Sequence, residues 1–318
     1  MNHLSINRVF NVSGLTALIT GGGTGIGLMM ARGLAANGAK VYIGGRRKAV
    51  VDKAAAENSN SNSDGTSGKI VPLALDVTDK ESIANAVKLI SKEDGKLDVL
   101  INKLVHQTSI KLEFTIVCSA GQEGPKSIFF SDPTSPERKD TTTLGTALFK
   151  SESFQGWADL FSINVSSNYF VSVAFLGLLE AATRARESET GGWSSSIVNI
   201  TSISGQMKLS QNHFAYNASK AAGNHLTKML STELALRNIP IRVNAIAPGA
   251  FPTEMTNLQA KNVDKVALGI SKVPSARGGI EADIAGAALY LASPASYYVN
   301  GQILTVDGGF IATNPSVV

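Results

Sequence analysis

The sequence predicts an α/β fold, with one doubly wound parallel sheet and helices on both of its faces. Two observations predict it. Short apolar stretches with strand character alternate with helical patterns along almost the whole chain, and a glycine-rich turn joins the first strand to the first helix. A length of 318 residues leaves room for about two domains. Because strands of the same sheet lie on both sides of every irregular stretch, we predict a single domain over residues 1–318.

The expected elements are taken in chain order. Each strand is an apolar run bounded by polar residues or glycine, and each helix repeats apolar residues three or four positions apart. In the first part of the chain we expect strands at 15–20, 41–43, 70–75 and 97–102, with helices at 28–37, 48–57 and 79–93. In the second part we expect helices at about 154–184, 213–237 and 281–292, with strands at 196–200, 241–246 and 303–306.

Three stretches do not follow this alternation. Residues 58–68 are rich in Ser, Asn and Gly, and residues 187–195 contain a Gly-Gly pair, so both predict surface loops. Residues 121–149 hold three prolines among charged residues and threonines. We therefore expect residues 121–149 to form a loop extension at the surface, too irregular for core structure.

The composition excludes several classes of protein. The net charge of +4 is spread without a run of five like charges, so no nucleic-acid groove is expected. The single cysteine, Cys118, rules out an internal disulfide framework and a multi-cysteine metal site, and we expect no metal. The longest apolar run, 169–182, is interrupted by Ser172 and Glu180, so no membrane span is expected. Without a secretory signal pattern at the start, we expect a cytoplasmic protein.

The glycine-rich turn predicts a dinucleotide site. Gly21, Gly25 and Gly27 lie between a strand and a helix, where free backbone N–H groups and the positive helix end can hold a pyrophosphate. An NAD site expects an acidic residue about 20 positions further on. Residues 28–51 contain none, and the second strand is followed by Arg46 and Arg47. A guanidinium there can bind a 2′-phosphate, which predicts NADP(H); two solvated surface arginines are the alternative.

Tyr216 and Lys220 are expected on one face of a helix, four positions apart. A nearby cation can lower the pKa of a tyrosine toward the range useful for acid–base catalysis. Ser202 follows an expected strand and could donate a hydrogen bond to a substrate carbonyl. A Tyr-x3-Lys pair alone is more often an ordinary helix surface; together with the glycine-rich turn it indicates a reacting centre.

The order and spacing of these motifs resemble the short-chain dehydrogenase/reductase family over nearly the whole chain. The resemblance rests on Thr20-Gly21-x3-Gly25-Ile26-Gly27, Asp76-Val77, Asn164-Val165, Ser202, Tyr216-x3-Lys220, Pro248-Gly249-x3-Thr253 and Val306-Asp307-Gly308-Gly309. It implies a catalytic tetrad of Asn164, Ser202, Tyr216 and Lys220. Tyr216 would exchange the hydroxyl proton, and Ser202 would orient the carbonyl. Lys220 would lower the pKa of Tyr216 and hold the nicotinamide ribose, and Asn164 would hold a water linked to Lys220.

The resemblance also implies the cofactor contacts. Asp76 and Val77 would lie against the adenine, Asn102 would contact a ribose, and residues 248–253 would lie against the nicotinamide. The full implied set is Gly21, Gly25, Ile26, Gly27, Arg46, Arg47, Asp76, Val77, Asn102, Tyr216, Lys220, Pro248, Gly249, Phe251 and Thr253. Three alternatives stay open: Asn164 as a polar helix residue, Ser204 in place of Ser202, and Asp76 as a helix cap.

The expected activity is therefore that of an NADP(H)-dependent oxidoreductase moving a hydride between the nicotinamide and a ketone or secondary alcohol. Residues 246–255 look most similar to reductases of the 3-oxoacyl-carrier-protein type, which does not fix a substrate. Apolar residues in the expected lid, 254–277, favour a substrate with hydrophobic surface, unless they only pack the lid down. The resemblance implies a homotetramer or homodimer, with a monomer as the alternative; the small residues of the helices at about 154–184 and 213–237 permit close packing with partner subunits.

One departure from the family pattern follows the fourth strand. The family has Asn-Asn-Ala-Gly there, whereas this chain has Asn102-Lys103, a further stretch, and then Ala120-Gly121. Removing residues 103–119 and adding one Asn restores the motif and keeps the reading frame. Possible codons allow the removed nucleotide segment to begin with GT and end with AG, as introns do. We therefore suspect a retained intron, with a genuine insertion as the alternative. If translated, Lys103 would disturb the cofactor site, and a catalytically impaired protein with only a binding role is the alternative function. The extension at 121–149 suits the mouth of the active site.

Overall fold

The structure is a computed structural model of the chain. It describes residues 2–58, 68–103, 124–186, 193–252 and 270–317. The predicted insertion, apart from Lys103, and most of the predicted lid lie outside these residues.

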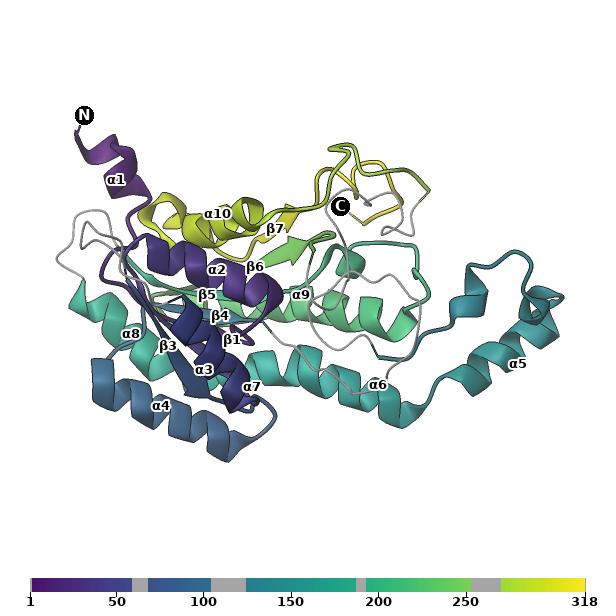
Figure 1. The fold of residues 1–318 in the computed structure, drawn as a ribbon, viewed down its shortest axis with the longest axis horizontal. Helices are drawn as coiled ribbons and strands as arrows, with labels where there is room; N and C mark the ends of the chain where they lie inside the picture. The colour runs from purple at the N-terminus through teal and green to yellow at the C-terminus, as the bar shows by residue number, and fades with distance from the viewer. Residues whose placement is uncertain (1, 59–67, 104–123, 187–192, 253–269, 318) are drawn as a thin grey trace.

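One parallel sheet of seven strands forms the centre of the molecule, in the order β3-β2-β1-β4-β5-β6-β7 (Figure 1). The predicted fold class, a Rossmann-type doubly wound sheet, is confirmed. Its strands are β1 Thr16–Thr20, β2 Lys40–Gly45, β3 Lys69–Ala74, β4 Val99–Asn102, β5 Ser195–Ile200, β6 Ile241–Pro248 and β7 Ile303–Val306. The inner strands form where apolar runs allow both faces of the sheet to be buried, whereas the edge strands β3 and β7 are partly exposed.

Helices cover both faces of the sheet. On one face lie α2 (Gly25–Ala36), α3 (Lys48–Glu57) and α10 (Glu281–Ala292), over a core that includes Ile19 and Ile43. On the other lie α4 (Lys80–Asp94), α7 (Ser167–Ala174), α8 (Leu176–Ala185) and α9 (Phe214–Leu236), over a core that includes Leu18 and Tyr42. Neighbouring residues of one strand thus point into different cores, as the twofold repeat of a strand requires. The short α1 (Ile6–Val9) precedes β1.

The prediction of one continuous helix over about 154–184 is wrong. The structure divides it into α6 (Phe154–Phe161), a π-helical turn at Ser162–Ser166, and then α7 and α8, with a bend of 48° at Phe175. The Phe175 side chain is fully buried against the sheet, so the bend seats an apolar residue that the apolar pattern alone does not distinguish from its neighbours. No single helix of the described residues is long and apolar enough to cross a membrane; this bent pair reaches that length and composition only as a pair.

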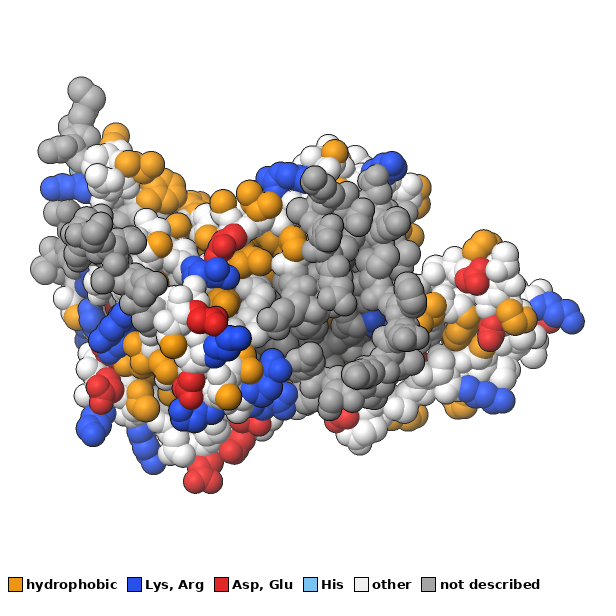
Figure 2. Space-filling view, viewed as in Figure 1, with side chains coloured by type: hydrophobic (Ala, Val, Ile, Leu, Met, Phe, Trp, Pro, Cys, Tyr) orange, Lys and Arg blue, Asp and Glu red, His pale blue; other side chains and the backbone are white. Residues whose placement is uncertain are grey.

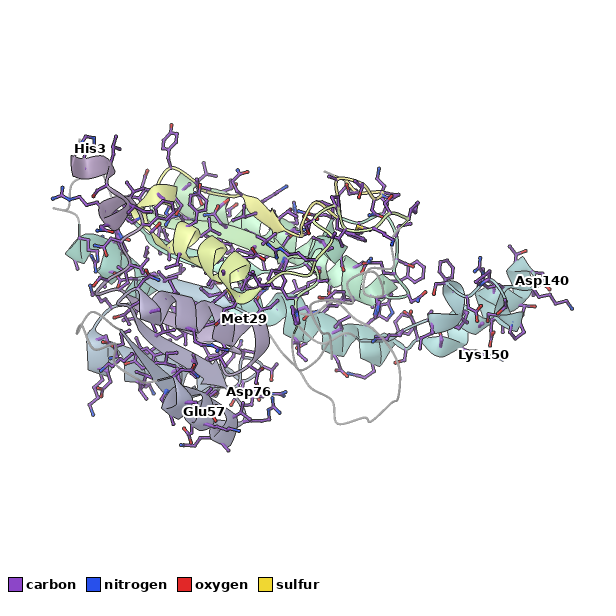
Figure 3. The ribbon with its side chains drawn as sticks, turned by 45° about the horizontal axis from the view of Figure 1, so that its top comes forward. His3, Met29, Glu57, Asp76, Asp140 and Lys150 are labelled. Carbon is purple, nitrogen blue, oxygen red and sulfur yellow. The ribbon has the colours of Figure 1, made fainter. Side chains whose placement is uncertain are left out.

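The region 121–149, expected to be irregular, carries part of a regular helix. Helix α5 (Thr141–Ser151) begins where the Asp140 side chain accepts a hydrogen bond of 2.8 Å from the Thr143 amide. No residue of α5 is buried, which agrees with a surface extension. The helix projects away from the body of the molecule as an arm (Figures 1 and 2), and Asp140 and Lys150 lie out along it (Figure 3).

Arg242 of β6 ties the sheet to the segment after α10. Its buried guanidinium donates to the Ser194 hydroxyl (3.0 Å), the Ser296 carbonyl (3.0 Å) and the Leu291 carbonyl (3.1 Å), and it lies 5.6 Å from the Tyr297 ring centre. Burial lowers the pKa of Arg242 to about 10. Each hydrogen bond to a buried charged group contributes more than a neutral one.

Replacing Arg242 with Met is expected to lower the free energy of unfolding by about 2–4 kcal/mol, because the carbonyl oxygens around it lose their donor. Denaturant unfolding of the two proteins measures the difference. Arg237→Met is the matched control, since that exposed arginine pairs only on the surface with Glu233, and it should shift stability by roughly 0.5 kcal/mol or less. Equal effects of the two changes would contradict the role given to Arg242.

Candidate active site

The predicted site residues gather at one edge of the sheet. All seven strands are parallel, so their carboxyl ends share this edge, and the pairing of Thr20 with Asn102 marks the place where the strand order reverses. In an open α/β sheet that is where ligands bind. The residues that directly follow a strand here are Gly21 after β1, Arg46 after β2, Lys103 after β4 and Gly249 after β6.

The glycine-rich loop has the shape of an anion cradle. Gly21 (φ +60°) and Gly25 (φ +52°) both take the left-handed conformation that favours glycine. A Cβ atom at Gly27 would collide with the Gly21 carbonyl oxygen, so only glycine lets α2 start this close to the loop. The first turn of α2 holds no acidic side chain. These residues fit the pyrophosphate of a dinucleotide, which the N–H groups and positive end of α2 would hold. Ile26 is buried in the core below.

Lys103 lies directly against this loop. Its amide and carbonyl groups both bond the Thr20 hydroxyl, at 3.0 and 3.1 Å, and a Cβ at Gly21 would collide with its carbonyl oxygen. The Lys103 ammonium is 3.4 Å from the carbonyl oxygens of Gly21 and Thr24. A buried cation therefore lies across the mouth of the cradle, in a position where the family has an uncharged asparagine.

The adenosine end of the predicted site is open to solvent. Arg46 and Arg47 are exposed at the end of β2, and Val77 is half-buried against the core. The Asp76 carboxylate accepts hydrogen bonds from the Thr78 amide (2.9 Å) and hydroxyl (2.7 Å). The cap of α4 is Asp79, which accepts from the Glu81 amide, so Asp76 is not the helix cap. Its contact with adenine stays a prediction.

Ser202 lies just beyond β5 and is buried. Its oxygen accepts a hydrogen bond of 3.1 Å from the Ser204 amide, and among the described residues its hydroxyl donates to none. The Ser204 hydroxyl, in contrast, donates to the Gln211 side chain at 3.2 Å. Of the two serines, Ser202 is therefore the one with a hydroxyl proton to offer a substrate oxygen.

Tyr216 and Lys220 lie in the first two turns of α9, and each side chain is about 3% exposed. The Lys220 ammonium is 5.5 Å from the centre of the Tyr216 ring and 3.4 Å from the Ile200 carbonyl oxygen at the end of β5. Burial, and to a smaller extent the positive charge of Lys103, together lower the pKa of Lys220 to about 7. The pair thus lies beside the same strand ends as Ser202.

Asn164 lies in the π-helical turn between α6 and α7, and α9 packs against this turn. Its amide nitrogen donates to the Ser219 hydroxyl (3.0 Å), which in turn donates to the Tyr216 carbonyl (2.8 Å). Asn164 therefore connects two helices at the reacting centre rather than lying on a solvated helix face. The water-holding role stays a prediction.

The segment after β6 carries the residues predicted to lie against the nicotinamide. Gly249 donates to the Val306 carbonyl at 2.9 Å, directly after Pro248 ends the strand, and the buried Phe251 ring packs over Gly279. Phe251 also lines a cavity of about 390 Å³ that reaches from Ala250 to Gly309. Thr253 and most of the expected lid lie outside the described residues, so their predicted contacts are not described.

Asn102 braces the sheet. It is fully buried, and its amide nitrogen donates to the Ser172 hydroxyl (2.9 Å) and to the Asn199 side chain (3.0 Å) of the neighbouring strand. These two hydrogen bonds brace β4 against β5 and against α7. The contact with a cofactor ribose stays a prediction.

Sequence reasoning missed two residues beside Tyr216. His213, just before α9, is 6% exposed, and its ring centre is 6.2 Å from that of Tyr216. Asn212, its neighbour, is also buried. The only available signal was their place directly before the Tyr-x3-Lys motif, and nothing in the residue types distinguishes them from a turn that starts a helix.

Comparisons with known proteins agree with this geometry. The short chain dehydrogenase family model matches residues 15–110, and the enoyl-(acyl carrier protein) reductase model matches residues 144–311. The chain is 36% identical over 315 residues to the short-chain dehydrogenase/reductase PhomF of Diaporthe leptostromiformis, covering 97% of this chain and 95% of the relative. It is 32% identical over 302 residues to gluconate 5-dehydrogenase of Gluconobacter oxydans, covering 95% and 96%.

Two solved structures extend the comparison. The Pseudomonas aeruginosa RhlG active-site complex with NADP is 25% identical, with a TM-score of 0.70 and coverage of 96% of this chain and 99% of that one. A 7α-hydroxysteroid dehydrogenase complexed with NADH and 7-oxoglycochenodeoxycholic acid is 26% identical, with a TM-score of 0.72 and coverage of 96% and 98%. Both nicotinamide dinucleotides thus occur among structures similar to this chain.

Proposed function

The chain belongs to the short-chain dehydrogenase/reductase family of oxidoreductases, and we propose that it is an NADP(H)-dependent enzyme that interconverts a ketone and a secondary alcohol. The observation that carries the proposal is the placement of Tyr216, Lys220 and Ser202 at the strand ends beside the glycine-rich loop. A hydroxyl donor, a phenol and a buried amine are the groups that carbonyl reduction needs around its oxygen atom.

The residues divide the acid–base work. In the reducing direction Tyr216 donates its proton to the carbonyl oxygen, and in the oxidising direction it accepts the proton of the alcohol. The Lys220 ammonium stabilises the phenolate that remains. Ser202, held by the Ser204 amide, donates a hydrogen bond to the same oxygen. The glycine-rich loop would hold a nicotinamide dinucleotide, which would supply or accept the hydride at the substrate carbon.

The choice of NADP(H) over NAD(H) rests on the end of β2. Arg46 and Arg47 lie there, both exposed, and no acidic side chain occurs in residues 28–51. A guanidinium binds a 2′-phosphate through charge-assisted hydrogen bonds, whereas the ribose hydroxyl of NAD would call for a carboxylate.

Replacing Arg46 and Arg47 together with Ala is expected to weaken NADPH binding by about 10–100-fold and to leave NADH binding within about threefold, because only NADPH loses a charge-assisted contact. Fluorescence titration with each dinucleotide measures both constants. Arg138→Ala, on the turn before α5, is the control for a change of surface charge. A variant that loses affinity for NADH as much as for NADPH would contradict the assignment.

The proposed activity is tested by mixing the purified chain with NADPH and a panel of ketones and 3-oxoacyl thioesters, and recording the loss of NADPH absorbance. Relatives named for gluconate 5-dehydrogenase and for 7α-hydroxysteroid dehydrogenase activity support hydroxyl and carbonyl groups as the reacting class. Absence of turnover with every member of the panel, despite measured NADPH binding, would favour the impaired protein.

The impaired protein is the second candidate because of Lys103. Its ammonium, 3.4 Å from the carbonyl oxygens of Gly21 and Thr24, lies across the loop that would hold the pyrophosphate. A lysine in this position alters the loop on which the affinity for the dinucleotide depends.

Replacing residues 103–119 with a single Asn is therefore expected to strengthen NADPH binding by about tenfold, since the loop regains the uncharged neighbour of the family pattern. Calorimetric titration of the shortened and full-length chains with NADPH makes the comparison. Equal dissociation constants would show that the insertion does not disturb the site, and transcript reads that all contain the segment would end the intron hypothesis.

A further inference from the structure

The turn that precedes α9 is unusual in its backbone. Gln211 (φ +52°) and Asn212 (φ +65°) are consecutive non-glycine residues in the left-handed region. Side chains disfavour that conformation, and it persists where the surroundings hold it in place and where a site needs the resulting geometry. The turn ends at His213, three residues before Tyr216.

The surface extension holds this turn in place. The Ser127 backbone amide donates to the Asn212 backbone carbonyl (3.0 Å), and the side-chain amide nitrogen of Asn212 donates to the Ser131 hydroxyl (2.8 Å). The rings of Phe130 and Phe214 meet edge to face, with centres 5.3 Å apart. From the other side, the Ser204 hydroxyl bonds the Gln211 side chain. The turn is thus fixed between the extension and the strand end that carries Ser202.

Two polar atoms of this turn are buried without a partner. Among the described residues, neither Nδ1 of His213 nor Oδ1 of Asn212 has a hydrogen-bond partner, and both side chains are more than nine-tenths buried. Buried polar atoms are almost always hydrogen-bonded, so an exception beside a reacting group needs an explanation. Several other buried side chains of the described residues also hold such an atom; His213 is the one whose ring lies next to that of Tyr216, and Asn212 directly precedes it in the sequence.

The charge of the site restricts what could bind these atoms. Burial, and to a smaller extent the positive charge of Lys126, together lower the pKa of His213 to about 4. The imidazole is therefore neutral at physiological pH, with one donor and one acceptor nitrogen. Asn212 Oδ1 can only accept. A hydroxyl group, which both donates and accepts, matches this pair, whereas a carboxylate would meet an acceptor and an ammonium would meet the charge of Lys126.

We infer that His213 and Asn212 are specificity-determining residues, which hold a second hydroxyl group that the substrate carries close to its reacting carbon. The inference rests on the proposed function, since it places this hydroxyl beside the carbonyl oxygen that Tyr216 protonates. It makes the substrate an uncharged hydroxy ketone, or the corresponding diol, rather than a simple ketone. A substrate that lacks the hydroxyl leaves the buried atoms without partners. Sites of this kind bind the substrate with the hydroxyl much more tightly than the analogue without it.

The test compares acetoin with 2-butanone, which differ by one hydroxyl beside the carbonyl. Binding is measured by ligand-observed NMR on the full chain without added dinucleotide, so that acetoin, itself a secondary alcohol, is neither reduced nor oxidised. The native protein is expected to bind acetoin about tenfold more tightly than 2-butanone or better, and His213→Leu is expected to reduce this ratio to near one. Asn212→Gly, which tolerates the left-handed backbone, should reduce it in part.

Two further variants separate recognition from structure. His225→Leu, an exposed histidine on the same helix, should leave the ratio unchanged. His213→Leu should melt at or above the temperature of the native chain, because an apolar side chain replaces a buried nitrogen without a partner. His213→Gln should retain part of the preference.

A ratio near one in the native protein overturns the inference, whether or not any variant folds. A ratio that His213→Leu leaves unchanged, with or without a lowered melting temperature, overturns it as well and makes His213 structural. The proposed function is judged separately, by NADPH-dependent turnover. If the native protein prefers acetoin over 2-butanone but turns over no ketone, the proposed reaction is rejected and the recognition site is retained.

Discussion

Replacing Tyr216 with Phe is expected to lower kcat by about 10²–10⁴-fold, the usual effect of removing a general acid–base. The change deletes one oxygen atom and keeps the ring that packs with Leu160 and Ala215. The fold and the affinity for NADPH should therefore be retained, since the ring and its apolar contacts remain.

The measurement combines steady-state rates on the best ketone of the panel with fluorescence titration of NADPH. Tyr298→Phe is the control, because that side chain is fully exposed and far along the chain from α9. A kcat within tenfold of the native value would show that a group other than Tyr216 transfers the proton. If the affinity for NADPH fell as much as kcat, the Tyr216 hydroxyl would be needed to bind the cofactor rather than to transfer the proton.

Replacing Lys220 with Met is expected to abolish activity and, at the same time, to stabilise the fold. The pKa of Lys220 is lowered from 10.5 to about 7, first by burial and then by Lys103. At pH 6 the folded protein must therefore hold a buried ammonium, whereas the unfolded chain holds the same charge in water. Methionine fills a similar space without that cost, and the gain in unfolding free energy should be on the order of 4 kcal/mol.

The stabilisation by Lys220→Met should depend on pH, because the protonation of Lys220 differs between the folded and unfolded chains. Between about pH 7 and 10.5 the unfolded chain binds a proton at Lys220 that the folded protein does not, so the native stability rises with pH through this range. The advantage of the variant should be full below pH 7 and should shrink by roughly 1 kcal/mol per pH unit above it. Lys228→Met, an exposed position on the same helix, should show no such trend. A constant difference between pH 6 and 9 would contradict the lowered pKa.

The fold could be predicted from the sequence because its signals are local. Alternating apolar strands and helices, and the glycine-rich turn at Gly21–Gly27, specify the βαβ units without reference to the rest of the chain. Boundaries agree within a few residues, and α2 begins at Gly25, three positions before the expected start. Helix α5 was missed although Asp140 followed by threonines is a cap signal, because the prolines before it outweighed the pattern.

The remaining features depend on contacts distant in the sequence. The bend at Phe175 follows from how its ring is buried against the sheet, and the turn at Gln211–Asn212 is held by residues more than eighty positions earlier, such as Ser127. The place of Lys103 across the glycine-rich loop needs the pairing of β1 with β4. His213 carries no motif of its own, and its role can be argued only after its burial beside Tyr216 is known.

The strand order has a consequence for biosynthesis. Beyond Asn102, each later strand joins the sheet at the edge left by the one before it: β5 on β4, β6 on β5, and β7 on β6. The sheet can therefore grow in the order in which the ribosome delivers the chain. The longest interval comes between β4 and β5, when residues 103–194 must be synthesised while the edge of β4 presents backbone N–H and C=O groups without a partner strand. A nascent chain stopped in this interval would be the form most in need of a chaperone.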